Sequence, residues 1–169
     1  AFALPGGEVV IMSGLIAASR TPEEVAGVLA HEMQHVIGRH GLRQMIHSLG
    51  IVVVAQIAFG GAGELLAILR NQAPRLLSLK FSRKQETEAD TKGLELLRAA
   101  GISPGGLISF FERLSRKEGA VGEGLSFIST HPASKRRIAD LREVISREPA
   151  GSSVEFQLDW KEVRRRCKA

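Results

Sequence analysis

The chain has 169 residues, of which 44% are apolar and 24% charged, and its formal net charge is +5. This composition is typical of a globular protein and excludes collagen-like, low-complexity and wholly disordered chains. The length predicts a single domain over residues 1–169, with a core at about 1–147 and a basic extension at about 148–169. Cys167 is the sole cysteine, so no intrachain disulfide can form.

The N-terminal part of the chain predicts a small sheet followed by a helix. Phe2–Gly14 is consistent with two short extended segments around a turn at Pro5-Gly6-Gly7. In Thr21-Pro22-Glu23-Glu24, the threonine can cap a helix and the last glutamate completes a capping box. Apolar positions then repeat with the helical period, which predicts a helix that runs to about residue 40.

The rest of the chain predicts mainly helices. A glycine-rich loop is expected at about 119–130, and the C-terminal end suggests a short strand at 153–158 followed by a helix. The predicted fold is therefore mainly α with a small N-terminal β-sheet, in the α+β class. The other helices are expected at about 42–58, at about 64–70, from Pro74 to near Gly101, from Ser103-Pro104 to about Lys117, and from Pro132 to before Pro149.

Two segments are candidates for contact with a membrane surface. Residues 51–69 begin with an apolar run that Gln56, three glycines and Glu64 interrupt, so the run is too short to span a bilayer. A buried or lid-like helix is the favoured interpretation, and a membrane-contacting hairpin is the alternative. The tail from Lys135 onward carries ten basic and six acidic residues. Because no aromatic residues alternate with arginines 164–166, a solvated surface is favoured there and no nucleic-acid partner is expected.

The sequence His31-Glu32-Met33-Gln34-His35 carries the clearest chemical signal. Histidines four residues apart on a helix project from the same face, and their neutral nitrogens can bind one tetrahedral zinc ion at about 2.0–2.1 Å. Glu32 points about 100° away from His31, where it can take a proton from water on the open side of a metal. The alternative is a pair of surface histidines on an amphipathic helix.

A third protein ligand is needed, and the chain offers two candidates. His40 falls one position before the third histidine of the metzincin pattern, and in a continuous helix it would point away from His31 and His35. We interpret it as a polar residue at a helix end, with a ligand or near-site role as the minor alternative. The second candidate is Glu86, which shares a helix face with Asp90. A glutamate leaves a fourth position for water, and Asp90 can hydrogen-bond the free nitrogen of a ligating histidine.

The whole pattern resembles the gluzincin zinc endopeptidase family that includes HtpX, BepA, the Oma-type peptidases and the CAAX prenyl proteases. The opening of the chain is most similar to the BepA/Oma-type branch. The resemblance implies a zincin-like fold in which His31, His35 and Glu86 bind one zinc ion per chain, Glu32 is the catalytic base and Asp90 orients a ligand. Four blocks carry it in order: Ala1–Gly7, Leu29–Val36 with Arg39-His40, Ser82-Arg83 with Glu86–Asp90 and Gly93, and Thr130-His131-Pro132 with Arg137-Ile138.

His131 precedes a proline, which restricts its backbone to extended geometry. It can donate a hydrogen bond to the oxyanion formed when water attacks a peptide carbonyl, or it can occupy the open zinc position in a resting state. The alternative is a residue at a helix N-terminus with no catalytic part, and the resemblance favours the near-site roles. Arg137 is expected to pair with an acid and hold its helix in place.

These residues predict a zinc metalloendopeptidase with polypeptide substrates, in which Glu32 activates a zinc-bound water. Val9–Ser13 can form an edge strand that binds an extended substrate. Such binding favours unfolded or misfolded substrates. The branch resemblance implies a place in the bacterial cell envelope, in the periplasm or at a membrane, so envelope or membrane-associated substrates are expected. Two other classes stay open: a latent homologue that binds misfolded envelope proteins, and a basic module that binds nucleic acid or anionic lipid through 161–168.

Overall fold

The computed structural model describes residues 1–4, 6–59, 80–117, 131, 134–147 and 154–167. The predicted class is confirmed, since helices dominate and the N-terminus forms a two-stranded antiparallel sheet in which Phe2 pairs with Val10. The described elements, in chain order, are β1 (Phe2–Ala3), β2 (Val9–Val10), α1 (Ser13–Ala18), α2 (Pro22–Ile37), α3 (His40–Phe59), α5 (Arg83–Ala99), α6 (Gly105–Lys117), α8 (Lys135–Ser146) and α9 (Trp160–Arg166).

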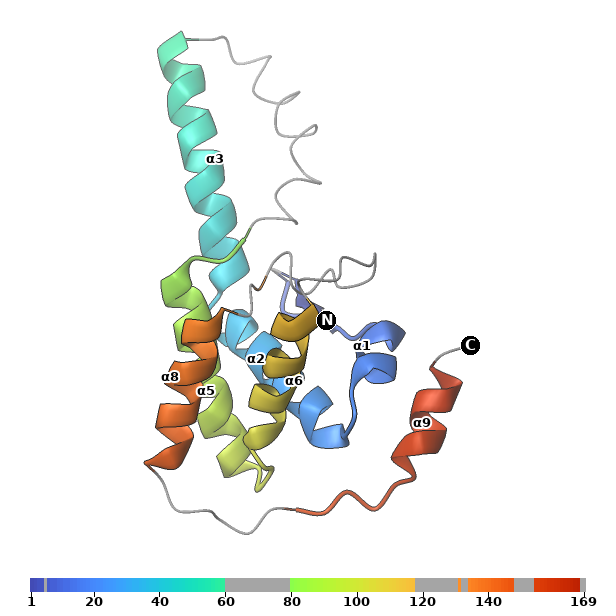
Figure 1. Ribbon diagram of the computed structural model, residues 1–169. Helices are drawn as coiled ribbons and strands as arrows, with labels where there is room; N and C mark the ends of the chain where they lie inside the picture. The colour runs from blue at the N-terminus through green and yellow to red at the C-terminus, as the bar shows by residue number, and fades with distance from the viewer. Residues whose placement is uncertain (5, 60–79, 118–130, 132–133, 148–153, 168–169) are drawn as a thin grey trace.

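Helix α2 lies at the centre of the molecule, between α5 and α6, and α8 covers α5 and α6 from the other side (Figure 1). Two glycines allow α6 to approach the backbone of α2 closely. A Cβ atom on Gly27 would come within 2.8 Å of the Leu107 backbone, and one on Gly106 within 2.3 Å of the Glu23 carbonyl oxygen. The fully or nearly fully buried side chains of this core include Val28, Leu94, Leu107, Phe110 and Phe111.

The start of α2 at Pro22 agrees with the prediction, but the predicted capping box is absent. Thr21 makes no side-chain capping bond. The Glu24 carboxylate instead accepts a hydrogen bond from the Arg20 backbone N–H at 2.7 Å and pairs with Arg113 of α6. Arg113, which is distant in the sequence, therefore binds the carboxylate that the local pattern assigned to the cap. Helix α1 was not predicted.

Helix α5 begins at Arg83 and not at Pro74, because residues 80–82 are not helical. Its start is fixed by a capping box: the Gln85 N–H donates to the Ser82 hydroxyl, and the Ser82 N–H donates to the Gln85 side chain. The predicted strand at 153–158 is absent from 154–158, where the Val154 N–H donates to the Gly101 carbonyl. The helix expected at 64–70 and the loop expected at 119–130 lie outside the described residues.

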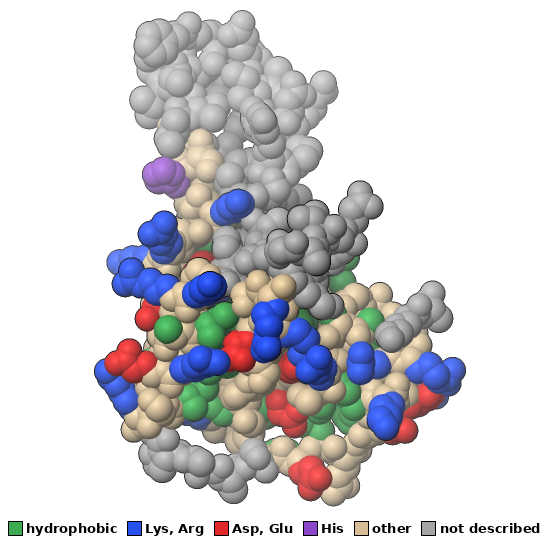
Figure 2. Space-filling view, in the orientation of Figure 1, with side chains coloured by type: hydrophobic (Ala, Val, Ile, Leu, Met, Phe, Trp, Pro, Cys, Tyr) green, Lys and Arg blue, Asp and Glu red, His purple; other side chains and the backbone are tan. Residues whose placement is uncertain are grey.

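Helix α3 extends away from the packed helices (Figure 1). Within the part of the chain that the structure describes, no helix combines the length and the apolar character needed to cross a bilayer. The short helix α9 packs against α1, and its Arg165 and Arg166 pair with Glu162. Charge is not restricted to this tail, since Lys and Arg side chains, with acidic ones between them, are spread over the face that Figure 2 shows.

Candidate metal centre and active site

Helix α2 carries the first part of the site into the protein interior. The side chains of His31, Glu32 and His35 are at most 1% exposed. Helix α5 faces them and supplies Glu86 and Asp90 from its first two turns, each 3% exposed. His131 reaches the same point from the segment before α8 and is 1% exposed.

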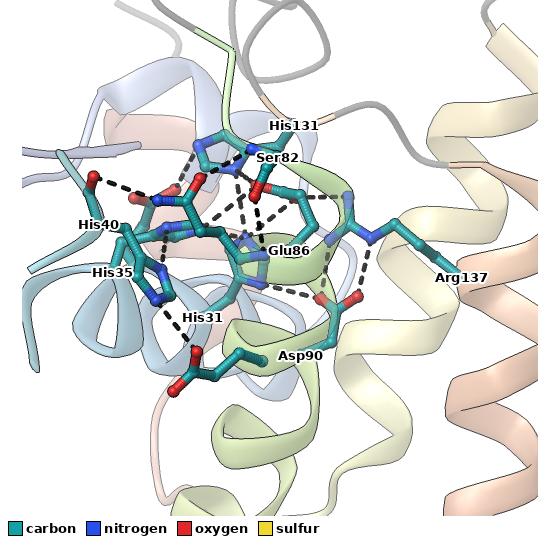
Figure 3. Close-up of polar contacts among 11 residues, drawn as sticks. His31, His35, His40, Ser82, Glu86, Asp90, His131 and Arg137 are labelled. Atoms are coloured by element: carbon teal, nitrogen blue, oxygen red, sulfur yellow. Dashed lines mark hydrogen bonds and ion pairs between the residues drawn. The ribbon is translucent and has the colours of Figure 1, made fainter. Parts of the chain in front are cut away.

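Four side chains point their donor atoms at one another (Figure 3). His31 Nε2 lies 3.0 Å from His35 Nε2 and 3.2 Å from His131 Nδ1. Glu86 Oε1 lies 2.9 Å from His131 Nδ1 and 3.4 Å from His35 Nε2. Ligand atoms placed around a tetrahedral zinc ion at the usual bond lengths lie roughly 3.3 Å apart. The set therefore fits such an ion, and His131 stands at the corner that the sequence had left open.

The protonation properties of His35 and Glu86 suit metal ligation, which requires neutral imidazole and ionised carboxylate. Burial lowers the pKa of His35 to about 3. Burial alone would raise the pKa of Glu86, but hydrogen bonds from His131 and His35 hold it well below its usual range. Burial acts to lower the pKa of His31, but the hydrogen bond and charge of Asp90 raise it above its usual value.

Asp90 and Arg137 support the donor set from behind. Asp90 Oδ1 lies 2.9 Å from His31 Nδ1, the nitrogen on the far side of the ring from the donor cluster. Arg137 donates from Nε and Nη2 to the two Asp90 oxygens, both at 2.7 Å, and its Nη1 lies 2.6 Å from Glu86 Oε2. Burial would raise the pKa of Asp90, but the hydrogen bonds from Arg137 and His31 lower it. Arg137, for which one acidic partner was expected, therefore has two, Glu86 and Asp90.

Glu32 lies beside the donor set and does not belong to it. Its side chain is fully buried, and neither carboxylate oxygen accepts a hydrogen bond from a residue that the structure describes. His131 Nε2 lies 3.4 Å from Glu32 Oε1. Burying a carboxylate without a hydrogen bond costs free energy, so this carboxylate is suited to bind a polar molecule such as water.

The predicted orientation of His40 is wrong. The helix does not continue through this residue: α2 ends at Ile37, Arg39 adopts a left-handed conformation (φ 49°), and α3 begins at His40. The His40 ring is fully buried, with Nδ1 3.0 Å from His35 Nδ1. Burial lowers the pKa of His40, while Glu88 opposes this effect. The glycine at position 38, a weak helix former, was the available sequence signal, although the left-handed residue is Arg39.

Sequence analysis also missed Phe81, which stacks on the His35 ring with centroids 3.9 Å apart and lies 5.1 Å from the His131 ring. No residue pattern marked it, because its role depends on the start of α5 at Arg83. Beyond Phe81, a groove of about 1130 Å³ runs between α5 and α8, from Glu86 to Asp140. An aromatic wall and an open groove thus flank the donor set.

Most of the chain is similar to known proteins. The model of peptidase family M48 matches residues 1–145. The mitochondrial metalloendopeptidase OMA1 of Schizosaccharomyces pombe is 38% identical over 146 residues, which is 85% of this chain and 42% of that protein. The metalloprotease LoiP of Escherichia coli is 37% identical over 151 residues, or 86% of this chain and 58% of LoiP. The beta-barrel assembly-enhancing protease of E. coli is 30% identical over 154 residues, covering 84% and 31%. The chain thus spans less than two thirds of each of these relatives.

Proposed function

Because the chain belongs to peptidase family M48, we propose that it is a zinc-dependent endopeptidase, with His31, His35 and Glu86 as ligands of one zinc ion. The observation that carries this proposal is the convergence of these donor atoms beside a buried carboxylate that no described residue hydrogen-bonds. A zinc ion with a purely structural role would not require a buried carboxylate without a hydrogen bond at the position of Glu32. The proposal therefore joins a metal site and a general base in one cavity.

Each side chain then has a defined task. When bound, zinc supplies Lewis-acid chemistry, polarising a carbonyl oxygen and making water acidic near neutral pH. Glu32 accepts the proton from the attacking water and passes it to the leaving nitrogen of the peptide bond. Asp90 holds the proton of His31 on Nδ1, so that Nε2 presents its lone pair to the metal. Arg137 fixes the Glu86 and Asp90 carboxylates in place.

Hydrolysis needs a free corner for water, whereas His131 Nδ1 lies among the donors. We therefore propose that this arrangement is a resting one, in which the His131 ring occupies the position of the attacking water and its net effect is to slow hydrolysis. The variant His131→Ala is expected to raise the initial rate of hydrolysis several-fold, measured with an unfolded protein substrate at saturating zinc. A fall in kcat of about 10²-fold would instead assign the ring to the oxyanion and contradict the resting state.

The proposed substrates are extended polypeptides. Strand β2 pairs with β1 on one side, and a substrate strand can add to a sheet edge through backbone hydrogen bonds alone. Such binding favours unfolded chains over folded ones. One relative is named a mitochondrial metalloendopeptidase and another a beta-barrel assembly-enhancing protease. These names support misfolded envelope or membrane-associated proteins as the proposed substrates, and an envelope or membrane-associated location. Membrane contact through 51–69 or the basic tail is proposed from the sequence alone.

The proposal is tested by metal removal. The purified protein is expected to cleave unfolded casein, to lose this activity when treated with 1,10-phenanthroline, and to regain it with stoichiometric zinc. Elemental analysis should give one zinc per active chain. Cleavage that persists in metal-free protein would contradict the proposal. Stoichiometric zinc without any cleavage, also in His131→Ala, would favour a latent homologue that only binds misfolded proteins.

A further inference from the structure

We propose that His40 is a positioning residue, which accepts a hydrogen bond from Nδ1–H of His35 and thereby holds His35 Nε2 toward the metal. This inference rests on the proposed function, because it assigns His35 as a ligand. It adds a residue to the site that the H-E-x-x-H pattern does not contain. His40 itself is not a ligand, since its ring lies behind His35 and outside the donor set.

The chemistry of imidazole fixes the direction of this hydrogen bond. A neutral ring carries one N–H and one lone pair, so His35 can give Nε2 to a metal only if Nδ1 is the protonated nitrogen. Its Nδ1 lies 3.0 Å from His40 Nδ1, which must then be the acceptor. The proton of His40 is thereby assigned to Nε2, which lies 3.5 Å from Glu88 Oε2 and makes no hydrogen bond to a described residue. The tautomers of both rings then follow from the bond of His35 to the metal.

The fold builds this contact with several independent features. A side chain at position 38 would collide with the imidazole, since a Cβ on Gly38 would lie 2.4 Å from His40 Nε2. The left-handed backbone of Arg39 separates the end of α2 from the start of α3, and the His40 ring lies against His35 of α2. The Gln85 side-chain amide donates to the His40 carbonyl oxygen at 3.4 Å. Helices α2, α3 and α5 therefore meet at a ring that is fully buried.

The two candidate ligand histidines of α2 are thus held by different partners. Asp90 presents a carboxylate to His31 Nδ1, whereas His40 presents a neutral nitrogen to His35 Nδ1. A carboxylate is the stronger acceptor and makes its imidazole the more basic ligand. Partners of this kind typically contribute 10–100-fold to metal affinity or activity, so we expect about that effect from His40.

Three variants test the inference. His40→Phe keeps a ring of similar size but removes the acceptor, whereas His40→Asn places an amide oxygen near the position of Nδ1. His47→Phe is the matched control, because His47 is an exposed histidine on the same helix. Zinc affinity is measured by competition with a chromophoric chelator. Nuclear magnetic resonance of the zinc-loaded, ¹⁵N-labelled protein then reports whether the His35 Nδ1 proton is protected from exchange with water.

We expect His40→Phe to weaken zinc binding by about 10–100-fold and to leave the His35 Nδ1 proton unprotected. His40→Asn should restore most of both properties, and His47→Phe should resemble the wild type. Wild-type affinity in His40→Phe would overturn the inference. So would a His40→Asn variant that binds zinc as weakly as His40→Phe, because the ring would then act only through packing. A wild-type protein that binds no zinc would overturn the proposed function itself, so the two failures are distinguishable.

Discussion

Replacement of Glu32 by glutamine is expected to remove almost all hydrolysis while zinc remains bound. The amide is nearly isosteric with the carboxylate, and Glu32 lies outside the four-donor set, so the metal site should persist. The amide cannot accept a proton from water at neutral pH. We expect kcat to fall by roughly 10²–10⁴-fold, the usual contribution of a positioned general base. The measurement is turnover of unfolded casein by protein whose zinc content has been determined in the same sample.

The matched control for this variant is Glu23→Gln, which removes a carboxylate from the first turn of the same helix. It should keep wild-type turnover. If Glu32→Gln lost zinc as well as activity, Glu32 would act as a ligand and the proposed division of roles would be wrong. If it kept most of its turnover, another group would have to supply the base.

Removal of the Glu86 carboxylate is expected to have its main effect on metal binding. In Glu86→Ala, two imidazoles on α2 and the His131 ring remain, but the only anionic donor of the set is lost. We expect zinc affinity to fall by more than the roughly 10–100-fold that supporting residues contribute, with hydrolysis lost in parallel. Chelator competition and elemental analysis measure the loss. Glu86→Gln, which keeps the side-chain volume, separates the missing charge from the cavity.

Glu95→Gln is the control for Glu86, because Glu95 is an exposed glutamate two turns further along α5. Thermal unfolding of metal-free samples shows whether Glu86→Ala still folds, which matters because Arg137 loses one of its two acidic partners. A folded Glu86→Ala protein that kept full zinc occupancy would remove Glu86 from the ligand set. The proposed mechanism would then lack its third ligand.

Much of this site was predictable because it follows local periodicity. His31 and His35 share a face of α2 through their four-residue spacing, and Glu86 and Asp90 do the same on α5. Neither inference needed the exact ends of the helices. The family resemblance, confirmed by the match to peptidase family M48, connected the two helices before their packing was known. The mainly helical fold with its N-terminal sheet was accessible in the same way.

The features that sequence analysis missed depend on where helices stop or on partners distant in the chain. His40 was placed by continuing α2 past Gly38, whereas Arg39 is left-handed and a separate helix, α3, begins at His40. Phe81 could be assigned to the site only once α5 was known to begin at Arg83. Glu24 left its expected cap because Arg113 of α6 binds it. Only for Glu24 did a tertiary contact outweigh a local preference, one of about 1 kcal/mol. The other two depend on where a helix begins or ends, which the local pattern places only to within a few residues.

Arg137 gives the protein an internal counter-ion. Two buried carboxylates a single helical turn apart would repel each other, and the guanidinium group of α8 balances that repulsion from within the chain. Small zinc fingers depend on their ion to fold at all. Here a cation encoded in the sequence offsets part of the charge of the acidic pair, so we expect the chain to fold without an ion and its folding and its chemistry to be separable.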